Sequence, residues 1–378
     1  SGTSSLPYAV AVAFFAAVLA FGGRAQDRFG PRLVATIGAS LTGVGLLVSS
    51  LSTAENPLPV TLGFGVLTGS GIALGFVSTF PAAAKWFPAK RRGLVTGVVV
   101  SGFGIASVYI APLTEYLLRS VGIRATFLAL GVGFLVATVS LAQLVRNPPL
   151  GFPGPVMPLI ADDDSAVHAP PVREFTWREL VRTRQFVQLW LMYGLTAFAG
   201  IMVIGHMAKI TQAQLGVDLG FLLVAILAVG NAAGRIGAGV VADRLGSART
   251  MTLVFTAQAV VLALTGFADT VALLSAAAFL IGFNYGADLS LFPLIITEYF
   301  GQANQGVNYG VVFTSWGVGG VFGSMAAGAI VDATGSYLPA FALAAGLCAV
   351  AAAITLFVRE PVTPGNGPHA RAPHSQRS

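Results

Sequence analysis

The sequence predicts an all-α membrane protein built from apolar helices that cross a lipid bilayer. Hydrophobic residues make up 55% of the 378-residue chain and charged residues only 10%, whereas roughly one quarter of a soluble domain is charged. The apolar residues gather in segments near the ~20 residues that a helix needs to cross a bilayer core at ~1.5 Å rise per residue. The basic residues behind the net charge of +6 lie in short loops, so this charge does not indicate nucleic-acid binding.

Eleven such segments can be read in order along the chain. They cover residues 6–21, 33–51, 58–80, 93–117, 123–144, 186–207, 221–241, 251–267, 271–296, 308–330 and 337–358. The chain opens on a small polar stretch, residues 1–5, which predicts a loop. The first apolar segment has no basic flank before it and no small-residue cleavage site after it, so it is not a signal peptide.

The loops between these segments alternate between basic and nearly uncharged. One set, with the C-terminal tail, carries most of the 21 basic residues: Arg24, Arg28, Arg32, Lys85, Lys90, Arg91, Arg92, Arg146, Arg173, Arg178, Arg182, Arg184, Arg244, Arg249, Arg359, Arg371 and Arg377. The other set carries only Arg119, Arg124 and Lys209. Because basic loops face the cytoplasm, we expect the first set and the tail to be cytoplasmic and residue 1 to lie outside.

One long interruption, residues 145–185, contains several prolines and three consecutive aspartates at 162–164. It predicts a cytoplasmic linker between two halves. The expected organisation is a five-span helical bundle over 1–145, the linker over 146–185, a six-span bundle over 186–358 and a disordered cytoplasmic tail over 359–378.

The end of this linker carries a helix-start signal. Thr176 and Glu179 have the spacing of a capping box, in which each side chain bonds the backbone of the other residue. This spacing predicts a short interfacial helix with Trp177 directed toward lipid. The alternative is a helix that is merely solvated.

The two halves resemble each other in sequence. DRFG at 27–30 matches DRLG at 243–246 at an offset of 216 residues. A second match, at an offset of 213, pairs Phe87, Gly93, Gly97, Val98 and Val99 with Phe300, Gly306, Gly310, Val311 and Val312. Both matches run in the same sense, which predicts a parallel repeat about an axis normal to the membrane, with a binding site between the halves near the midplane. Five spans against six indicate that a first helix is missing, so we expect the chain to be truncated at its start.

The chain's most unusual stretch is residues 221–249. The apolar run 221–241 contains Asn231 and Arg235, which lie four apart and therefore on one face of a helix. An arginine within a span is costly and usually faces a bundle interior or a watery cavity, where it can bind an anion. The alternative is that Arg235 reaches along its stem to the nearby headgroups.

Several motifs resemble those of a known family. GGRAQDRFGPR at 22–32 resembles the signature loop between helices two and three of the major facilitator superfamily. KWFPAKRRG at 85–93 and GHMAK at 205–209 are similar, more narrowly, to the oxalate/formate antiporter family and to bacterial monocarboxylate transporters. FNYG at 283–286 and VFTSWG at 312–317 add to that match. The resemblance implies a two-bundle helical carrier of twelve spans, of which eleven are readable and the first is missing.

The resemblance also implies roles for individual residues. Arg235 matches the arginine that holds a substrate carboxylate, and Asn231 falls where some monocarboxylate carriers have an acidic partner for it. Trp316 falls where the oxalate exchanger has a second substrate-binding lysine. The absence of that lysine disfavours a dianion, since one cation balances one carboxylate. Tyr285, in the matching FNYG motif, completes the candidate substrate site.

Trp316 and two further candidates, Asp288 and His206, leave alternatives open. Trp316 can pack against an apolar tail of the substrate or donate its indole N–H, or it can face lipid or pack between helices. Asp288, a second charge within a span, can neutralise Arg235 or carry a proton, or it can lie in a watery cytoplasmic vestibule. His206 titrates near neutrality when unperturbed and is a proton-coupling candidate, or it makes a structural hydrogen bond.

The loop charges are expected to control conformation. Asp27, Arg28, Asp243, Arg244 and Arg249 lie at cytoplasmic helix ends, where they can pair with partners or helix termini and latch an outward-facing state. Their alternative role is to set the topology.

These observations predict a secondary transporter of small carboxylates, of the lactate or formate class, that works by alternating access with protons or by exchange in a bacterial inner membrane. The alternatives are a transport-inactive receptor or accessory protein and a dicarboxylate antiporter of the oxalate type. No enzyme, cofactor or metal site is predicted, since no nucleophile–base pair or ligand cluster is visible and the single cysteine, Cys348, lies in an apolar run. The expected partners are a carboxylate, a proton or counter-anion, and the bilayer.

Overall fold

The computed structural model describes residues 6–53, 55–88, 91–149, 173–217 and 219–361, and within these ranges the chain is helical and forms no strand. The predicted all-α class is therefore confirmed. The predicted loop at 1–5, most of the predicted linker and the tail after residue 361 lie outside the described residues.

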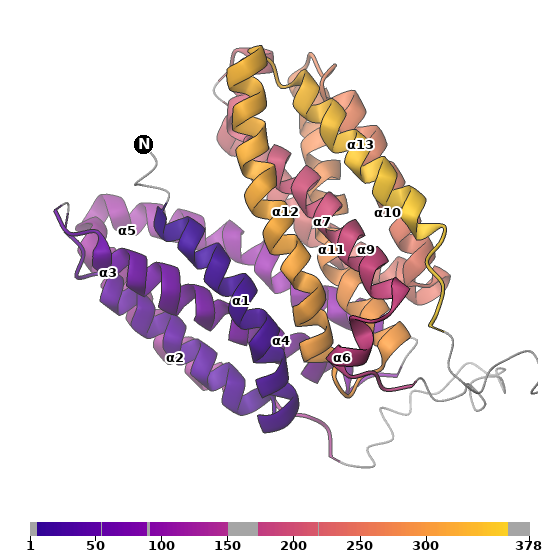
Figure 1. Ribbon diagram of the computed structural model, residues 1–378. Helices are drawn as coiled ribbons and strands as arrows, with labels where there is room; N and C mark the ends of the chain where they lie inside the picture. The colour runs from indigo at the N-terminus through magenta and orange to yellow at the C-terminus, as the bar shows by residue number, and fades with distance from the viewer. Residues whose placement is uncertain (1–5, 54, 89–90, 150–172, 218, 362–378) are drawn as a thin grey trace, which may run out of the picture.

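The first half of the chain forms one helical bundle, and the second half forms another (Figure 1). The first bundle contains α1 (Leu6–Phe29), α2 (Pro31–Ser49), α3 (Leu58–Val60), the π-helical stretch η1 (Thr61–Thr68), α4 (Gly69–Ala84) and α5 (Arg92–Ala142). The second contains α6 (Trp177–Leu180), α7 (Arg184–Ile204), α8 (Met207–Leu215), α9 (Gly220–Leu245), α10 (Ser247–Thr265), α11 (Val271–Phe300), α12 (Gln305–Thr334) and α13 (Leu338–Thr355).

Helix α5 combines two of the spans that the sequence predicts. It runs for 51 residues, but Gly122 interrupts it with φ 78° and ψ 174°, which are not helical angles. The first part packs against α9 through Gly97, and the second part packs against α2 through Gly131. By length and composition, ten helical stretches of the described chain can cross a membrane, and Arg92–Ala106 is a further, shorter apolar stretch.

The repeated DRFG and DRLG segments form equivalent turns. A single glycine separates α1 from α2 and α9 from α10: Gly30 has φ 83° and Gly246 has φ 82°. Side chains rarely tolerate such angles, whereas glycine does. The sequence repeat is therefore a structural repeat, with the same sharp reversal at the same place in each bundle.

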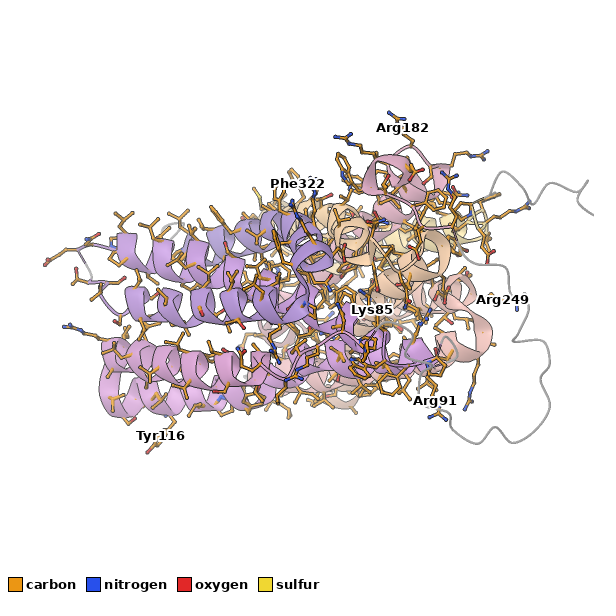
Figure 2. All side chains as sticks on the ribbon, turned by 90° about the horizontal axis from the view of Figure 1, so that it is seen from below. Lys85, Arg91, Tyr116, Arg182, Arg249 and Phe322 are labelled. Atoms are coloured by element: carbon orange, nitrogen blue, oxygen red, sulfur yellow. The ribbon has the colours of Figure 1, made fainter. Side chains whose placement is uncertain are left out.

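These turns lie at one end of the molecule, which we call the basic end. It carries the turns at residues 30, 85–88, 143–147, 246 and 301–304 and the segment 173–184. Hydrogen bonds between segments join parts of this end: Arg32 Nε donates to the carbonyl of Gln143, and Trp86 Nε1 donates to that of Arg146. Lys85, Arg91, Arg182 and Arg249 lie toward this end, whereas Tyr116 and Phe322 extend from the sides of the bundles (Figure 2).

The two bundles meet near α4 and α6 and diverge toward the beginning of α1 (Figure 1). They touch chiefly through α5 with α9 and α1 with α12. Glycines allow both contacts: a Cβ on Gly239 would lie 2.1 Å from the carbonyl oxygen of Gly93, and one on Gly23 would lie 2.1 Å from that of Gly306. Gly23 and Gly239 are 216 residues apart, and Gly93 and Gly306 are 213 apart, so the two contacts are equivalent under the repeat.

Candidate functional site

A cavity of about 310 Å³ lies between the two bundles. Six helices and the stretch η1 contribute its lining: Tyr8, Ala11, Val12 and Phe15 from α1, Phe64 from η1, Gly69, Ile72 and Phe76 from α4, Phe103 from α5, Arg235 from α9, Tyr285 and Leu289 from α11, and Phe313 and Trp316 from α12. Arg235 is the only charged residue among these described lining residues. The cavity therefore combines one cation with an otherwise mostly apolar wall.

Two hydrogen bonds hold the Arg235 guanidinium in place. Its Nε donates to Asn231 Oδ1 at 2.8 Å, one helical turn away, and its Nη1 donates to the backbone carbonyl of Val100 on α5. The side chain is 6% exposed. Among the described residues, no carboxylate lies within ion-pair distance of it and no protein acceptor contacts Nη2. The orientation matches the cavity alternative, and it leaves donors available to a bound anion.

Tyr285 and Trp316 also reach the cavity, and they bond to each other. Trp316 Nε1 donates to the Tyr285 hydroxyl at 2.9 Å. The indole stacks on Phe313, with ring centroids 4.8 Å apart. Because the tyrosine oxygen accepts from Trp316, its own proton remains free to donate to a ligand. The structure thus brings together Arg235, Asn231, Tyr285 and Trp316, the four residues that the sequence proposes for the substrate site.

Asp288 does not belong to this group. It is buried, 5% exposed, one turn beyond Asn284 on α11, and it does not line the cavity. Its Oδ1 and the Asn284 Nδ2 have no hydrogen-bond partner in the described structure. Neutralisation of Arg235 by Asp288, one of the alternatives that the sequence leaves open, is not seen here, since no ion pair joins these two described residues.

His206 lies at the opposite end of the molecule from the basic end, in the turn between α7 and α8. Its Nδ1 donates to the carbonyl of Met202 at 3.2 Å, and its ring centroid is 6.2 Å from that of Tyr337. Partial burial lowers the pKa of the imidazole, which favours the neutral form. This geometry matches the structural hydrogen bond that the sequence leaves open, and it places His206 away from the cavity lining.

At the basic end, two aspartates bind the starts of helices in the other bundle. Asp243 Oδ1 accepts from the Gly93 N–H at 2.8 Å, and its Oδ2 accepts from the Leu94 N–H at 2.9 Å. Asp27 Oδ2 accepts from the Val307 N–H at 3.3 Å. Helix starts carry unpaired N–H groups and a partial positive charge, so carboxylates are stabilising there. The two bonds are equivalent under the repeat, and the Asp243 pair is the tighter.

The neighbouring arginines do not take part in these contacts. The Arg28 guanidinium lies over the ring of Phe29, 5.3 Å from its centroid. Arg244 and Arg249 are exposed, and neither forms an ion pair with any residue that the structure describes. Of the five predicted gating residues, the aspartates therefore make the contacts between the bundles.

The segment before α6 binds the turn between α11 and α12, which the sequence did not predict. Glu174 Oε1 accepts from the Gln302 N–H at 3.1 Å, and its Oε2 accepts from the Ala303 N–H at 2.7 Å. The Phe175 N–H donates to the carbonyl of Phe300 at 2.9 Å. The end of the predicted linker is thus fastened beside the start of α12, the helix that Asp27 contacts.

The predicted capping box is confirmed at α6. The Thr176 side chain accepts from the Glu179 N–H, and Glu179 accepts from the Thr176 N–H at 2.8 Å. These bonds to Thr176 lower the pKa of the Glu179 carboxyl. The Trp177 ring is 37% exposed, with the Arg178 guanidinium 5.5 Å from its centroid.

Sequence reasoning missed most of the aromatic wall. Phe15, Phe76 and Phe103 line the cavity, yet no spacing or motif separates them from phenylalanines that pack in a core or face lipid.

The repeat gives one usable signal about the packing around Arg235: Leu19 lies 216 residues before Arg235 and is therefore the equivalent residue of the first bundle. A Cβ on Gly97 would lie 2.3 Å from the Arg235 carbonyl oxygen, and one on Gly310 would lie 2.7 Å from that of Leu19.

Comparisons with known proteins agree with this architecture. The family model of the Major Facilitator Superfamily matches residues 1–257 and 210–377. The chain is 28% identical to the MFS-type transporter YhjX of Escherichia coli, over 79% of this chain and 72% of that protein. It is also 28% identical to the oxalate:formate antiporter of Oxalobacter formigenes, over 89% and 78%, and 27% identical to monocarboxylate transporter 13 of Bos taurus, over 85% and 72%.

Solved structures show the same fold. The Major Facilitator Superfamily transporter FucP in the outward conformation aligns with a TM-score of 0.70 at 13% identity, over 94% of this chain and 90% of that chain. The proton:xylose symporter XylE aligns with a TM-score of 0.70 at 18% identity, over 94% and 87%.

Proposed function

Because the chain belongs to the major facilitator superfamily, we propose that it is a secondary transporter of small carboxylates, in the first place monocarboxylates, working by alternating access. The observation that carries this proposal is Arg235, a buried cation without a carboxylate partner among the described residues, at the edge of a cavity between the bundles. Two relatives support the substrate class by name, an oxalate:formate antiporter and a monocarboxylate transporter.

A carboxylate suits the donors that the site leaves free. Nη2 of Arg235 and the second proton of Nη1 form a planar pair, which matches the two oxygens of a carboxylate. The Tyr285 hydroxyl is a further donor on the same cavity, and Asn231 fixes the guanidinium through Nε. With one cation in the described lining, a second carboxylate on the ligand would lack a partner, which disfavours a dianion.

The two aspartate contacts are proposed to keep the basic end closed. The contact of Asp243 with the start of α5 and the contact of Asp27 with the start of α12 each join one bundle to the other. Both contacts must break before this end opens. The basic loops support a cytoplasmic position for this end, and the two bacterial relatives support an inner-membrane location. On this proposal the structure is a state that is closed toward the cytoplasm.

Asp288 is proposed as the site of proton coupling. It is buried in the second bundle without a cation beside it, and one carboxylate oxygen has no partner in the described structure. Buried acids within membrane spans commonly serve proton relays. Exchange of one anion for another is the alternative to coupling with protons.

The test is equilibrium binding to the purified chain, with short monocarboxylates and their uncharged amides as paired ligands. We expect the wild-type protein to bind the carboxylates and not the amides, and Arg235→Ala to lose that binding. Arg119→Ala is the matched control, because the Arg119 side chain is 80% exposed at the far end of α5's first part. Equal binding of acid and amide, or carboxylate binding that survives in Arg235→Ala, would refute the proposal.

A further inference from the structure

The cavity wall carries more information about the ligand than its one cation. Phe15, Phe76, Phe103, Phe313 and Trp316 come from four helices of both bundles and contact one another edge to face or in stacks. The Phe76 and Phe103 ring centroids are 4.9 Å apart, and those of Phe15 and Phe313 are 5.6 Å apart. All five residues line the cavity, so a ligand there meets aromatic side chains from both bundles.

The size of the cavity exceeds what the smallest carboxylates need. Its volume of about 310 Å³ corresponds to roughly ten waters at ~30 Å³ each. Formate has three heavy atoms, so it would leave most of this apolar wall in contact with water. A ligand whose apolar body displaces that water gains free energy in proportion to the apolar area that it buries.

The polar groups of the cavity wall further limit which ligands can bind. Besides Arg235, the described lining offers only the hydroxyls of Tyr8 and Tyr285 as side-chain polar groups that are still free, since the Trp316 N–H is bonded to Tyr285. No carboxylate lines the described part of the cavity. A ligand with an ammonium group would therefore bury that charge without a partner, which is strongly unfavourable.

Building on the proposed function, we infer that the substrate is a monocarboxylate with a bulky apolar body, best an aromatic ring, and without an ammonium group. Its carboxylate binds Arg235, and its ring fits among Phe15, Phe76, Phe103 and Trp316. Rings prefer offset-stacked or edge-to-face contacts with other rings, and the wall supplies both.

The experiment is calorimetric titration of the purified full chain in lipid nanodiscs with formate, acetate, benzoate, phenylacetate and 3-phenylpropanoate. Each added methylene that fits should tighten binding about fourfold, and the aromatic acids should bind at least tenfold more tightly than acetate. Phenylacetamide tests the carboxylate, and phenylalanine, which adds an ammonium group, should bind far more weakly than 3-phenylpropanoate.

Two variants test whether the aromatic ring of the ligand contacts the cavity wall. Phe103→Ala removes a ring from the wall and should weaken phenylacetate about five- to tenfold while leaving acetate unchanged. Phe21→Ala is the matched control, because Phe21 is 78% exposed on α1 and does not line the cavity. A wall that plays no part in recognition would leave both acids unaffected in both variants.

The outcomes separate this inference from the proposed function. If formate and acetate bind as tightly as the aromatic acids, and all lose binding in Arg235→Ala, the carboxylate site stands and the inference about the apolar body is wrong. If phenylacetamide binds as well as phenylacetate, the cavity recognises rings without their charge, and both statements fail.

Discussion

At the scale of single residues, the Arg235 guanidinium has to satisfy five N–H donors in a low-dielectric setting. Asn231 and the Val100 carbonyl accept two of them, and the outer edge of the guanidinium stays free for a ligand. An arginine held this way is pre-organised, because its orientation is fixed before an anion arrives. The same side chain without Asn231 would keep its charge and lose that orientation.

Replacing Arg235 by lysine should therefore damage binding even though the charge is kept. An ammonium cannot donate through a planar pair, and it cannot reproduce both the bond to Asn231 and a two-point contact with a carboxylate. We expect a loss of ~2–5 kcal/mol, which is roughly thirtyfold or more in affinity. Titration of wild-type and Arg235→Lys protein with one monocarboxylate measures it, and equal affinities would show that charge alone matters.

Asp288 should control how transport responds to pH. In proteoliposomes with an imposed pH gradient, Asp288→Asn should reduce pH-driven accumulation of the substrate more strongly than exchange, because an amide can no longer take up and release a proton. Asp269→Asn, at an exposed turn, is the control. An unchanged response to the gradient in Asp288→Asn would exclude this residue from proton coupling.

The sequence could indicate Arg235 and Asn231 because polar groups four apart within an apolar helix are rare and costly. It could not indicate Val100, since the acceptor is a main-chain carbonyl that every residue carries. It also could not place Asp288 relative to Arg235, because the positions of two residues in separate spans do not fix the direction in which each side chain points.

At the scale of helices, two pairs of glycines decide how closely the bundles approach. Gly239 meets Gly93 between α9 and α5, and Gly23 meets Gly306 between α1 and α12, with backbone against backbone in both pairs. Small residues permit this approach in membrane helices, where packing replaces the hydrophobic effect between spans. The aspartate contacts at the same end then bind helix starts that the glycines have brought within reach.

A methyl group at Gly239 should push the basic end apart. Its carbon would lie 2.1 Å from the Gly93 carbonyl oxygen, a backbone atom that cannot swing aside. In Gly239→Ala, a cysteine placed at Ala242, which is 3% exposed and near the same contact, should react with a thiol reagent at least about tenfold faster, as for a shift of roughly 1.4 kcal/mol.

Gly346→Ala is the matched control for Gly239→Ala. Gly346 on α13 has no atom within 4 Å of the position where its Cβ would be built, so alanine there should stabilise the helix slightly and leave the labelling rate unchanged. Equal labelling rates in the Gly239 and Gly346 variants would mean that the glycine contact does not hold this end closed.

The helices themselves were largely predictable, because long apolar runs between charged loops leave few other structures in a membrane. The sequence repeat matched Gly93 with Gly306, but it did not indicate the glycines that they meet, Gly239 and Gly23. Segment 173–175 was not predictable in the same way, since Glu174 caps a turn that lies more than a hundred residues further along the chain.

At the scale of the whole molecule, the two bundles are joined at the basic end and diverge from it (Figure 1). The family membership and the loop charges together predict which end faces the cytoplasm. Cys348 is fully buried and is the single cysteine of the chain, so new cysteines can report on each end against an almost unreactive background.

Cysteines at Asn147 and Arg249 should react only with reagents that reach the cytoplasmic side. Cysteines at Glu55 and Ser336 should react from outside, because these exposed positions lie in turns at the opposite end. Impermeant thiol reagents, applied to intact cells and to inverted vesicles, make the comparison. Labelling of Asn147 and Glu55 from the same side would contradict the predicted orientation.

The overall fold followed from the sequence repeat and the resemblance to a family, whereas the shape of the cavity did not. Its walls come from helices α1, α4, α5, α9, α11 and α12 together with η1, and their side chains meet only after both bundles have packed. Local sequence patterns do not predict such contacts.

The bond from Arg235 to Val100 has an energetic consequence for the cycle. It joins α9 to α5 across the boundary between the bundles, so separating these helices in the empty protein would strand a buried guanidinium without one of its acceptors. An anion that takes over as acceptor removes this penalty, and a ligand shifts a conformational equilibrium only by such a difference in affinity between states. On the proposed function, the empty carrier would therefore change conformation less readily than the loaded carrier, which is the behaviour that exchange of one anion for another requires.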